Sequence, residues 1–161
     1  MKTQKSFSIE EIQRKMEHFC AYRERCHKEI EQKLREFHLI SEGQSQIIQH
    51  LIAHNFLNET RFASAFARGK FRIKKWGKRR IIQELKQRDI SAYNLKKALA
   101  EIDDATYNEV FYELTQKKWE SLKDLSKQKR SQRFISHFNY RGWESGLIYE
   151  RLRELEENID Y

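Results

Sequence analysis

Residues 77–102 read GKRRIIQELKQRDISAYNLKKALAEI, and their pattern indicates the fold class. Apolar residues recur at helical spacing on both sides of the turn Asp89-Ile-Ser: Ile81, Ile82 and Leu85 before it, then Leu95, Ala98, Leu99 and Ile102. Apolar side chains at this spacing lie on one face of a helix and can be buried together. The stretch therefore predicts two amphipathic helices joined by a short turn.

The same apolar spacing recurs once before this stretch and once after it. Leu34, Leu85 and Phe138 are separated by 51 and 53 residues. The same two offsets relate four further sets: Ile30, Ile81 and Phe134; Leu39, Ile90 and Trp143; Ile48, Leu99 and Leu152; and Leu51, Ile102 and Leu155. Self-similarity at a fixed period is typical of helical repeats.

We therefore expect an all-α fold of three tandem three-helix repeats in an elongated, curved right-handed or solenoid-like array. The predicted repeats are 1–57, 58–102 with a ridge of basic residues, and 103–161 with an acidic tail.

Local signals mark where the expected helices begin and end. Ser8–Glu11 and Ser41–Gln44 both have the form of a capping box. Asn58, Ser91 and Asp103 are good N-cap residues, which directly precede the first residue of a helix. His38, Asp89 and Gly142 align just before a connection, where a helix often ends in the left-handed conformation. Gly takes that conformation freely and Asp tolerates it, so we expect Asp89→Gly to be neutral or mildly stabilising.

The composition excludes several classes of protein. The chain has 161 residues, 39% of them hydrophobic, with 5 Gly, no Pro and 2 Cys. This argues against a disordered chain, a Pro-rich linker, a sandwich with many tight turns and a disulfide framework. No apolar run approaches the ~18 residues that cross a bilayer, and Met1–Lys15 lacks the apolar core of a secretory signal. We expect a cytoplasmic protein.

The positive charge is concentrated in one segment. The net charge of the chain is +8, yet Arg68–Arg88 alone has ten basic residues and one acid, Glu84. We expect a cationic ridge here that contacts acidic protein surface or phosphate, made of Lys70, Arg72, Lys74, Lys75, Trp76, Lys78, Arg79, Arg80 and Lys86. The alternative is a solvated helix face with acidic neighbours folded close by.

Catalytic and metal chemistry find little support in the sequence. The phosphate-binding pattern Gly-x-x-x-x-Gly-Lys is absent. His50 and His54 lie four residues apart without a third metal ligand, and Cys20 and Cys26 are spaced poorly for zinc. We expect neither an enzyme nor a cofactor or metal.

Two motifs in the central segment resemble the RecX family of recombination regulators. Leu57, Asn58, Arg61, Phe62 and Ala63 match the family's Tyr-Leu-Asp/Asn-Asp-Glu-Arg-Phe-Ala pattern. Gly77, Ile81, Glu84 and Leu85 match its Gly-x-x-x-Ile-x-x-Glu-Leu pattern. With the three repeats, the resemblance covers about residues 12 to 157. Three residues depart from the family pattern: Glu59, Thr60 and Asp89, the last at a position where the family commonly has Gly.

The resemblance implies a function. RecX-like proteins bind the RecA filament along its groove and modulate it, mostly by inhibiting ATP hydrolysis and strand exchange, in DNA repair and recombination. They are cytoplasmic, are not enzymes and need no cofactor. We also expect a monomer that binds single- or double-stranded DNA weakly, with an affinity that falls as salt rises, because binding to phosphates releases counterions. We interpret Asn58, Arg61, Phe62, Gly77, Ile81, Glu84 and Leu85 as structural motif residues.

Two other functions remain open at this point. The helix–turn–helix within 77–100 could bind DNA directly, although the Arg and Lys residues gather on its first helix and base reading usually uses the second. The second helix offers Tyr93, Asn94, Lys96 and Lys97, a thin set for major-groove recognition. The chain could also be a helical scaffold for another acidic partner.

Overall fold

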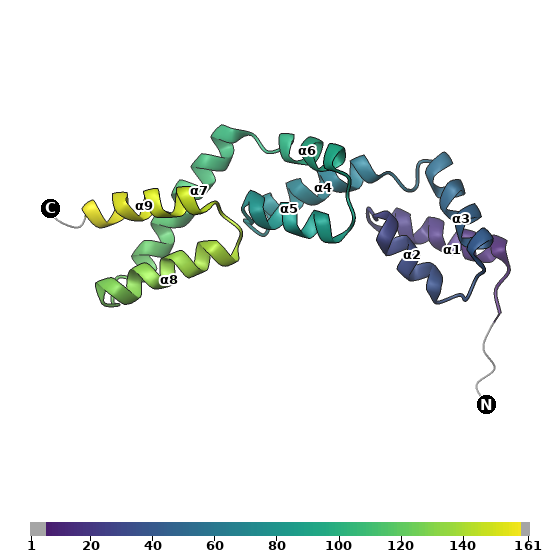
Figure 1. The fold of residues 1–161 in the computed structure, drawn as a ribbon, viewed down its shortest axis with the longest axis horizontal. Coiled ribbons are helices and arrows are strands. Elements are labelled where there is room, and N and C mark those ends of the chain that lie inside the picture. Colours follow the sequence, from purple (N-terminus) through teal and green to yellow (C-terminus); the bar gives the residue numbers. More distant parts are fainter. Residues whose placement is uncertain (1–5, 159–161) are drawn as a thin grey trace, which may run out of the picture. The chain divides into compact units, whose positions relative to one another are not determined.

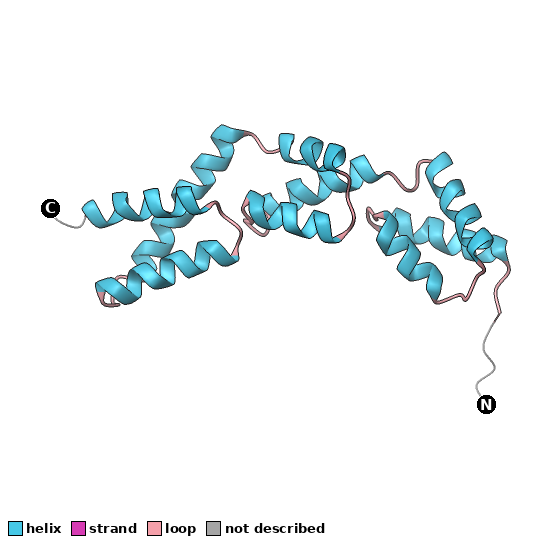
Figure 2. Cartoon of the chain, viewed as in Figure 1, coloured by secondary structure: helices cyan, strands magenta, loops and turns pink. Residues whose placement is uncertain are grey.

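The computed structural model describes residues 6–158, and every regular element in that range is a helix (Figures 1 and 2). In chain order they are α1 (Ile9–Tyr22), α2 (His27–Arg35), α3 (Ser41–Ala53), α4 (Glu59–Arg72), α5 (Lys78–Gln87), α6 (Ala92–Ala100), α7 (Asp104–Ser121), α8 (Lys127–Tyr140) and α9 (Ser145–Glu157). The predicted all-α class is confirmed, and nine helices without a strand among the described residues agree with three three-helix repeats.

The chain separates into two compact units. Unit 1 consists of Met1–Ala65 and Leu85–Lys97, and unit 2 of Phe66–Glu84 and Ala98–Tyr161. The residues of the predicted central repeat are thus divided between the units. The predicted boundaries after residues 57 and 102 fall in the connections before α4 and α7. The division into three repeats stays a prediction, and the end of its acidic tail, 159–161, lies outside the described residues.

Aliphatic side chains form the core of unit 1. α3 packs against both α1 and α2. The buried side chains that meet there are Ile12, Met16, Cys20, Ile30, Leu34, Ile47, Leu51 and Leu57. Burial raises the pKa of the Cys20 thiol to about 11, so this cysteine behaves as a small apolar core residue.

Aromatic side chains form the core of unit 2, where α7, α8 and α9 pack against one another. The Tyr107 and Trp143 rings stack with centroids 4.5 Å apart, and the Phe111 and Trp143 centroids are 5.0 Å apart. Phe134 and Phe138 continue the cluster at 4.9 Å. Such rings bury large areas, so this core differs in chemistry from that of unit 1 although the spacing of the sequence is shared.

A buried charge lies beside this aromatic core. Arg151 of α9 is 6% exposed, and its guanidinium donates to Thr115 Oγ1 at 3.0 Å and to Gln116 Oε1 at 2.9 Å. The positions at the same repeat offsets are Ile47 and Ala98, both fully buried. In the third copy this buried position therefore holds a hydrogen-bonded guanidinium, whereas the other two copies hold apolar side chains.

The apolar positions that recur in the sequence supply buried side chains in all three copies. Ile30, Ile81 and Phe134 have no exposed surface, and Leu34, Leu85 and Phe138 are at most 1% exposed. Leu51 of the third helix in the first copy and Leu155 of the third helix in the last copy are buried, as is Ile102, which follows the end of α6. Leu39, Ile48 and Leu99 are partly buried. The repeat pattern thus marks interior positions.

Most of the predicted helix starts are confirmed. Ser8, Ser91 and Asp103 each accept a hydrogen bond from the backbone N–H three residues on, as does Asn58 from Arg61 at 3.0 Å. The capping box at Ser41 is wrong. Ile40 precedes that helix, and Gln44 Nε2 instead donates to the Leu39 carbonyl at 3.3 Å.

The three aligned turn positions all adopt the left-handed conformation. The φ angles of His38, Asp89 and Gly142 are 54°, 57° and 84°. The alignment of the repeats at this position is therefore confirmed by the backbone itself.

Within residues 6–158, no helix combines the length and the apolar character that a bilayer crossing requires.

Candidate ligand-binding site in unit 2

Two backbone segments of unit 2 meet without intervening side chains at Gly77 and Gly142. Gly77 N–H donates to the Arg141 carbonyl at 2.8 Å, and Arg79 N–H donates to the Gly142 carbonyl at 3.0 Å. A Cβ atom on Gly77 would collide with the backbone of Gly142 and Trp143, and one on Gly142 would collide with Arg80. Because only glycine permits this approach, the start of α5 is fixed against the connection between α8 and α9.

Buried polar contacts hold the same junction. Trp143 Nε1 donates to the Lys75 carbonyl at 3.2 Å. The Tyr107 hydroxyl accepts from Lys78 N–H at 2.9 Å and donates to Glu144 Oε2 at 2.8 Å. Burial, with help from the Glu144 carboxylate, raises the pKa of Tyr107 far above its ordinary value, so the hydroxyl keeps its proton as a donor.

Cations and aromatic rings alternate across the surface of this junction. Lys70 Nζ lies 5.3 Å from the Phe66 centroid and 4.9 Å from that of Trp76. The Arg80 guanidinium carbon lies 4.1 Å from the Trp76 ring and 4.8 Å from the Tyr140 ring. We call Phe66, Lys70, Trp76, Arg80 and Tyr140 the cation–aromatic ladder. Cation–π attraction fixes the orientation of both cations.

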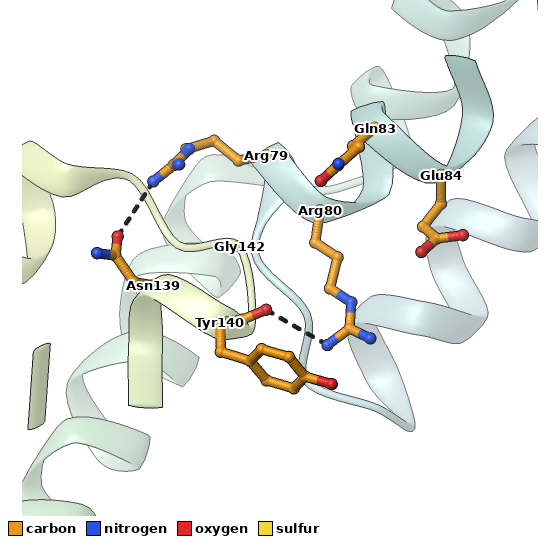
Figure 3. Close-up of a pocket in the computed structure, with 7 residues that line it drawn as sticks. All are labelled: Arg79, Arg80, Gln83, Glu84, Asn139, Tyr140 and Gly142. Atoms are coloured by element: carbon orange, nitrogen blue, oxygen red, sulfur yellow. Dashed lines mark hydrogen bonds between the residues drawn. The ribbon is translucent and has the colours of Figure 1, made fainter. Parts of the chain in front are cut away.

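A pocket of about 300 Å³ opens beside the ladder (Figure 3). It is lined by Arg79, Arg80, Gln83, Glu84, Asn139, Tyr140 and Gly142. Arg79 Nη1 donates to Asn139 Oδ1 at 3.3 Å and to the Trp143 carbonyl at 3.1 Å, and Arg80 Nη1 donates to the Tyr140 carbonyl at 3.4 Å. The oxygens that accept these hydrogen bonds are uncharged, so they do not offset the positive charges of the two guanidiniums at the pocket.

The structure brings some of the predicted ridge residues together and separates others. Lys70, Trp76, Arg79 and Arg80 surround the junction. Lys78 instead contacts other residues of unit 2. Its Nζ lies 3.1 Å from Asp104 Oδ1 and 4.6 Å from the Tyr107 ring centroid.

The remaining ridge residues take no part in the ladder. Arg72 and Lys74 are exposed and Lys75 is half-buried. Lys86 is exposed and belongs to unit 1. One continuous ridge stays a prediction, whereas the ladder and its pocket are a defined cluster.

Sequence reasoning missed Asn139 and Tyr140, which come from α8 more than fifty residues beyond the basic segment. One signal for Tyr140 was present: the repeat offsets align it with Glu36 and Gln87, two polar residues. Tyr140 is 73% exposed. Tyr140 is thus a large ring on a solvent-facing position that is polar in the other two copies.

No group of three or more His, Cys, Asp or Glu side chains that could hold a metal ion occurs in the described part of the chain. The His50 and His54 rings are 4.2 Å apart, and His50 Nε2 lies 2.7 Å from Glu17 Oε1. That histidine pair is thus engaged within unit 1.

Comparison with known proteins identifies the family. Residues 58–99 match the family model of the RecX second three-helix domain. The chain is 30% identical over 135 residues to the regulatory protein RecX of Clostridioides difficile, a match that covers 81% of this chain and 63% of that protein. The chain belongs to the RecX family.

Other RecX proteins match over similar lengths. The regulatory protein RecX of Oceanobacillus iheyensis is 25% identical over 143 residues, which are 89% of this chain and 53% of that protein. RecX of Herminiimonas arsenicoxydans is 28% identical and is covered to 91% of its length. The chain thus spans 53% to 63% of the first RecX relatives that it matches.

Two solved RecX structures share the fold. The crystal structure of RecX from Lactobacillus salivarius superposes with a TM-score of 0.78 at 22% identity, covering 92% of this chain and 96% of that one. A second crystal structure of a regulatory protein RecX gives a TM-score of 0.79 at 20% identity, with 91% and 73% covered. At these identities the likeness establishes the arrangement of helices.

The residues that match the RecX motifs make contacts within the chain. Arg61 Nε donates to Glu24 Oε1 at 2.6 Å, and its Nη2 donates to the Asn55 carbonyl at 3.0 Å. Phe62 is 3% exposed, and Ile81 and Leu85 are fully buried. Gly77 permits the backbone junction. These contacts support the interpretation of the RecX motif as structural, and Glu84 lies at the pocket.

Proposed function

We propose that this chain regulates a RecA recombinase by lodging in the groove of the RecA–DNA filament, where it suppresses ATP hydrolysis and strand exchange. One observation carries the proposal: the match to the RecX second domain spans 58–99, and the strongly basic segment 68–88 lies inside it. The relatives are named regulatory proteins. In our proposal the protein is no enzyme, needs no cofactor and acts in the cytoplasm as a monomer.

Charge supports this mode of binding. A groove between recombinase subunits and DNA offers carboxylates and phosphates, both of which attract the basic segment. Arg72 and Lys74 are exposed, and both come before Gly77 in the sequence. Electrostatic complementarity of this kind raises the rate of association and sets the orientation of the bound protein.

An ATPase titration tests the proposal. RecA assembled on single-stranded DNA hydrolyses ATP at a steady rate, and the purified chain is added in increasing amounts. We expect suppression at substoichiometric amounts, because one regulator bound in a continuous filament affects several neighbouring subunits. An unchanged rate combined with tight binding to bare DNA would establish the direct DNA-binding alternative instead.

Matched charge-reversal variants locate the surface. We expect Arg72→Glu with Lys74→Glu to weaken inhibition about tenfold. The control is Lys123→Glu with Arg153→Glu, two exposed cations of unit 2 outside the basic segment, which makes the same change in net charge. Equal effects of the two pairs would mean that net charge alone drives binding.

A further inference from the structure

A groove of about 200 Å³ lies between α7 and α9, two helices of unit 2 that pack against each other (Figure 1). Its lining, which we call the α7–α9 groove, includes Phe111 and Tyr112 of α7 and Leu147, Glu150 and Arg151 of α9. None of these residues belongs to the basic segment on which the proposed function depends. The volume is below that of most small-molecule sites and leaves room for one protein side chain.

We propose that the α7–α9 groove binds a lysine or arginine side chain from a cationic segment of a partner protein. The aliphatic stem of that side chain lies against Leu147 and Tyr112, and its charged head lies at Glu150. This docking surface has the opposite charge from the basic segment. It therefore goes beyond the proposed function, and either of the two can fail without the other.

A buried arginine determines which carboxylate of the groove is available. Arg151 is 6% exposed, and its guanidinium donates to Thr115 Oγ1 at 3.0 Å and to Gln116 Oε1 at 2.9 Å. It also donates to Glu154 Oε2 at 3.0 Å, so the charge of that carboxylate is matched within the chain. Among the described residues no cation is paired with Glu150, which is exposed. One carboxylate of the groove thus keeps its full negative charge for a ligand.

The apolar part of the groove suits the stem of a basic side chain. Phe111 is 5% exposed and Leu147 is half-buried. Tyr112 is 56% exposed, and the Arg151 guanidinium carbon lies 4.0 Å from its ring centroid, which orders the ring. Lysine and arginine bury their methylene groups along apolar surface while the charged head stays at the water. A purely apolar side chain would fill the same space but gain nothing from Glu150.

The charge around the groove favours a cationic partner. The helices α7 and α9 each contain four acids and two bases, in a chain whose net charge is +8. Asp104, Glu109 and Glu113 are exposed in the part of α7 that precedes Lys117, where no Lys or Arg occurs. Opposite charge on the two partners speeds their association and orients them, whereas a nucleic acid or an acidic peptide would be repelled.

The test is an NMR titration of the isotopically labelled chain with an alanine-based helical peptide of about 15 residues that has a lysine at every fourth position. We expect the amide shifts to change in α7 and α9, most strongly around Tyr112 and Glu150. In a second peptide norleucine, which has the stem without the ammonium group, replaces the central lysine. We expect its Kd to be about 3- to 5-fold higher at low salt, a difference that shrinks as salt rises.

Matched variants test the role of Glu150. We expect Glu150→Gln to raise the Kd of the lysine peptide about 3- to 5-fold, and Glu150→Lys to raise it by about tenfold or more. The controls are Glu157→Gln and Glu157→Lys, which make the same changes of charge at an exposed position of α9 outside the groove. Because both glutamates are exposed, we expect all four variants to keep the thermal melt of the original chain.

Four results would overturn this docking site. The first is an equal Kd for the Glu150 and Glu157 variants, and the second is a set of shifts that leaves α7 and α9 unchanged. The third is equal binding of the norleucine and lysine peptides at low salt, which would point to an apolar occupant. The fourth is self-association of the chain without peptide that Glu150→Lys abolishes, which would make a second copy the occupant. Inhibition of RecA by Glu150→Gln, measured in parallel, reports on the proposed function separately.

Discussion

The turns of unit 1 and the turn between α8 and α9 in unit 2 have the same backbone conformation but opposite tolerance of side chains. His38 and Asp89 hold left-handed φ angles in exposed positions of unit 1. Gly142 holds such an angle in unit 2 with the backbone of Arg80 directly against it. A left-handed residue in solvent can therefore be short and polar, whereas one covered by another segment must be glycine.

Gly142→Ala should produce the largest effect, because it places a side chain at the covered turn. The new methyl group meets the backbone of Arg80, and the positive φ adds strain. We expect a loss of about 3 kcal/mol or more in the free energy of unfolding, measured by urea denaturation. Gly146→Ala is the control: a Cβ there meets nothing within 4 Å, and alanine favours the helix α9. Equal losses for both variants would contradict the close approach.

Trp143→Phe tests the polar contact that accompanies this turn. Trp143 aligns with Leu39 of unit 1, but its indole N–H donates to the Lys75 carbonyl. Phenylalanine keeps most of the aromatic packing and leaves that carbonyl without its donor. We expect a loss of about 2 kcal/mol in the free energy of unfolding, measured by urea denaturation. A stability within error of the original protein would show that solvent replaces the indole.

His137 should make the stability of unit 2 depend on pH. Burial, then the charges of Arg141 and Lys118, lowers its pKa from 6.5 to about 4. As pH falls below 6.5 the unfolded chain takes up a proton that the folded chain resists, so stability decreases toward pH 4. We expect a loss on the order of 1 kcal/mol between pH 7 and pH 4.5, since the ring is only partly buried.

Denaturation of His137→Gln at the two pH values provides the control. The aligned residue of unit 1 is Lys33, whose Nζ lies 2.9 Å from Glu36 Oε2. If the glutamine variant keeps the full pH dependence, another group is responsible.

Asp89→Gly should have the smallest effect. Its φ of 57° costs an aspartate a little and a glycine nothing, while its 3.7 Å contact with Lys28 Nζ is between exposed groups and contributes little. We expect a change in the free energy of unfolding between zero and about 0.5 kcal/mol of stabilisation, seen in a thermal melt. A clear loss would mean that the carboxylate has a role in the turn.

Local features of the fold could be predicted from the sequence because each depends on a few neighbouring residues. The helix starts at Ser8 and Asn58 and the left-handed turn at Asp89 follow from side-chain and backbone preferences within one turn. The capping box at Ser41 failed for a local reason too. Ile40 already occupies the capping position, so Ser41 is the first residue within the helix.

The candidate site could be predicted only in part. Lys70, Trp76 and Arg80 lie in the basic segment, which the sequence marks by its charge. Tyr140 and the junction of Gly77 with Gly142 depend on contacts between residues about sixty positions apart, for which one sequence provides no direct signal. The repeat alignment predicted the left-handed conformation of Gly142, but it did not predict that Arg80 packs against this residue.

The aromatic core of unit 2 has a consequence for spectroscopy. All three tryptophans of the chain, Trp76, Trp119 and Trp143, belong to that unit, and two of them are almost fully buried. Indole emission therefore follows the opening of unit 2 alone, whereas circular dichroism at 222 nm follows the helices of both units. Denaturation curves that diverge between the two signals would reveal that the units unfold one after the other.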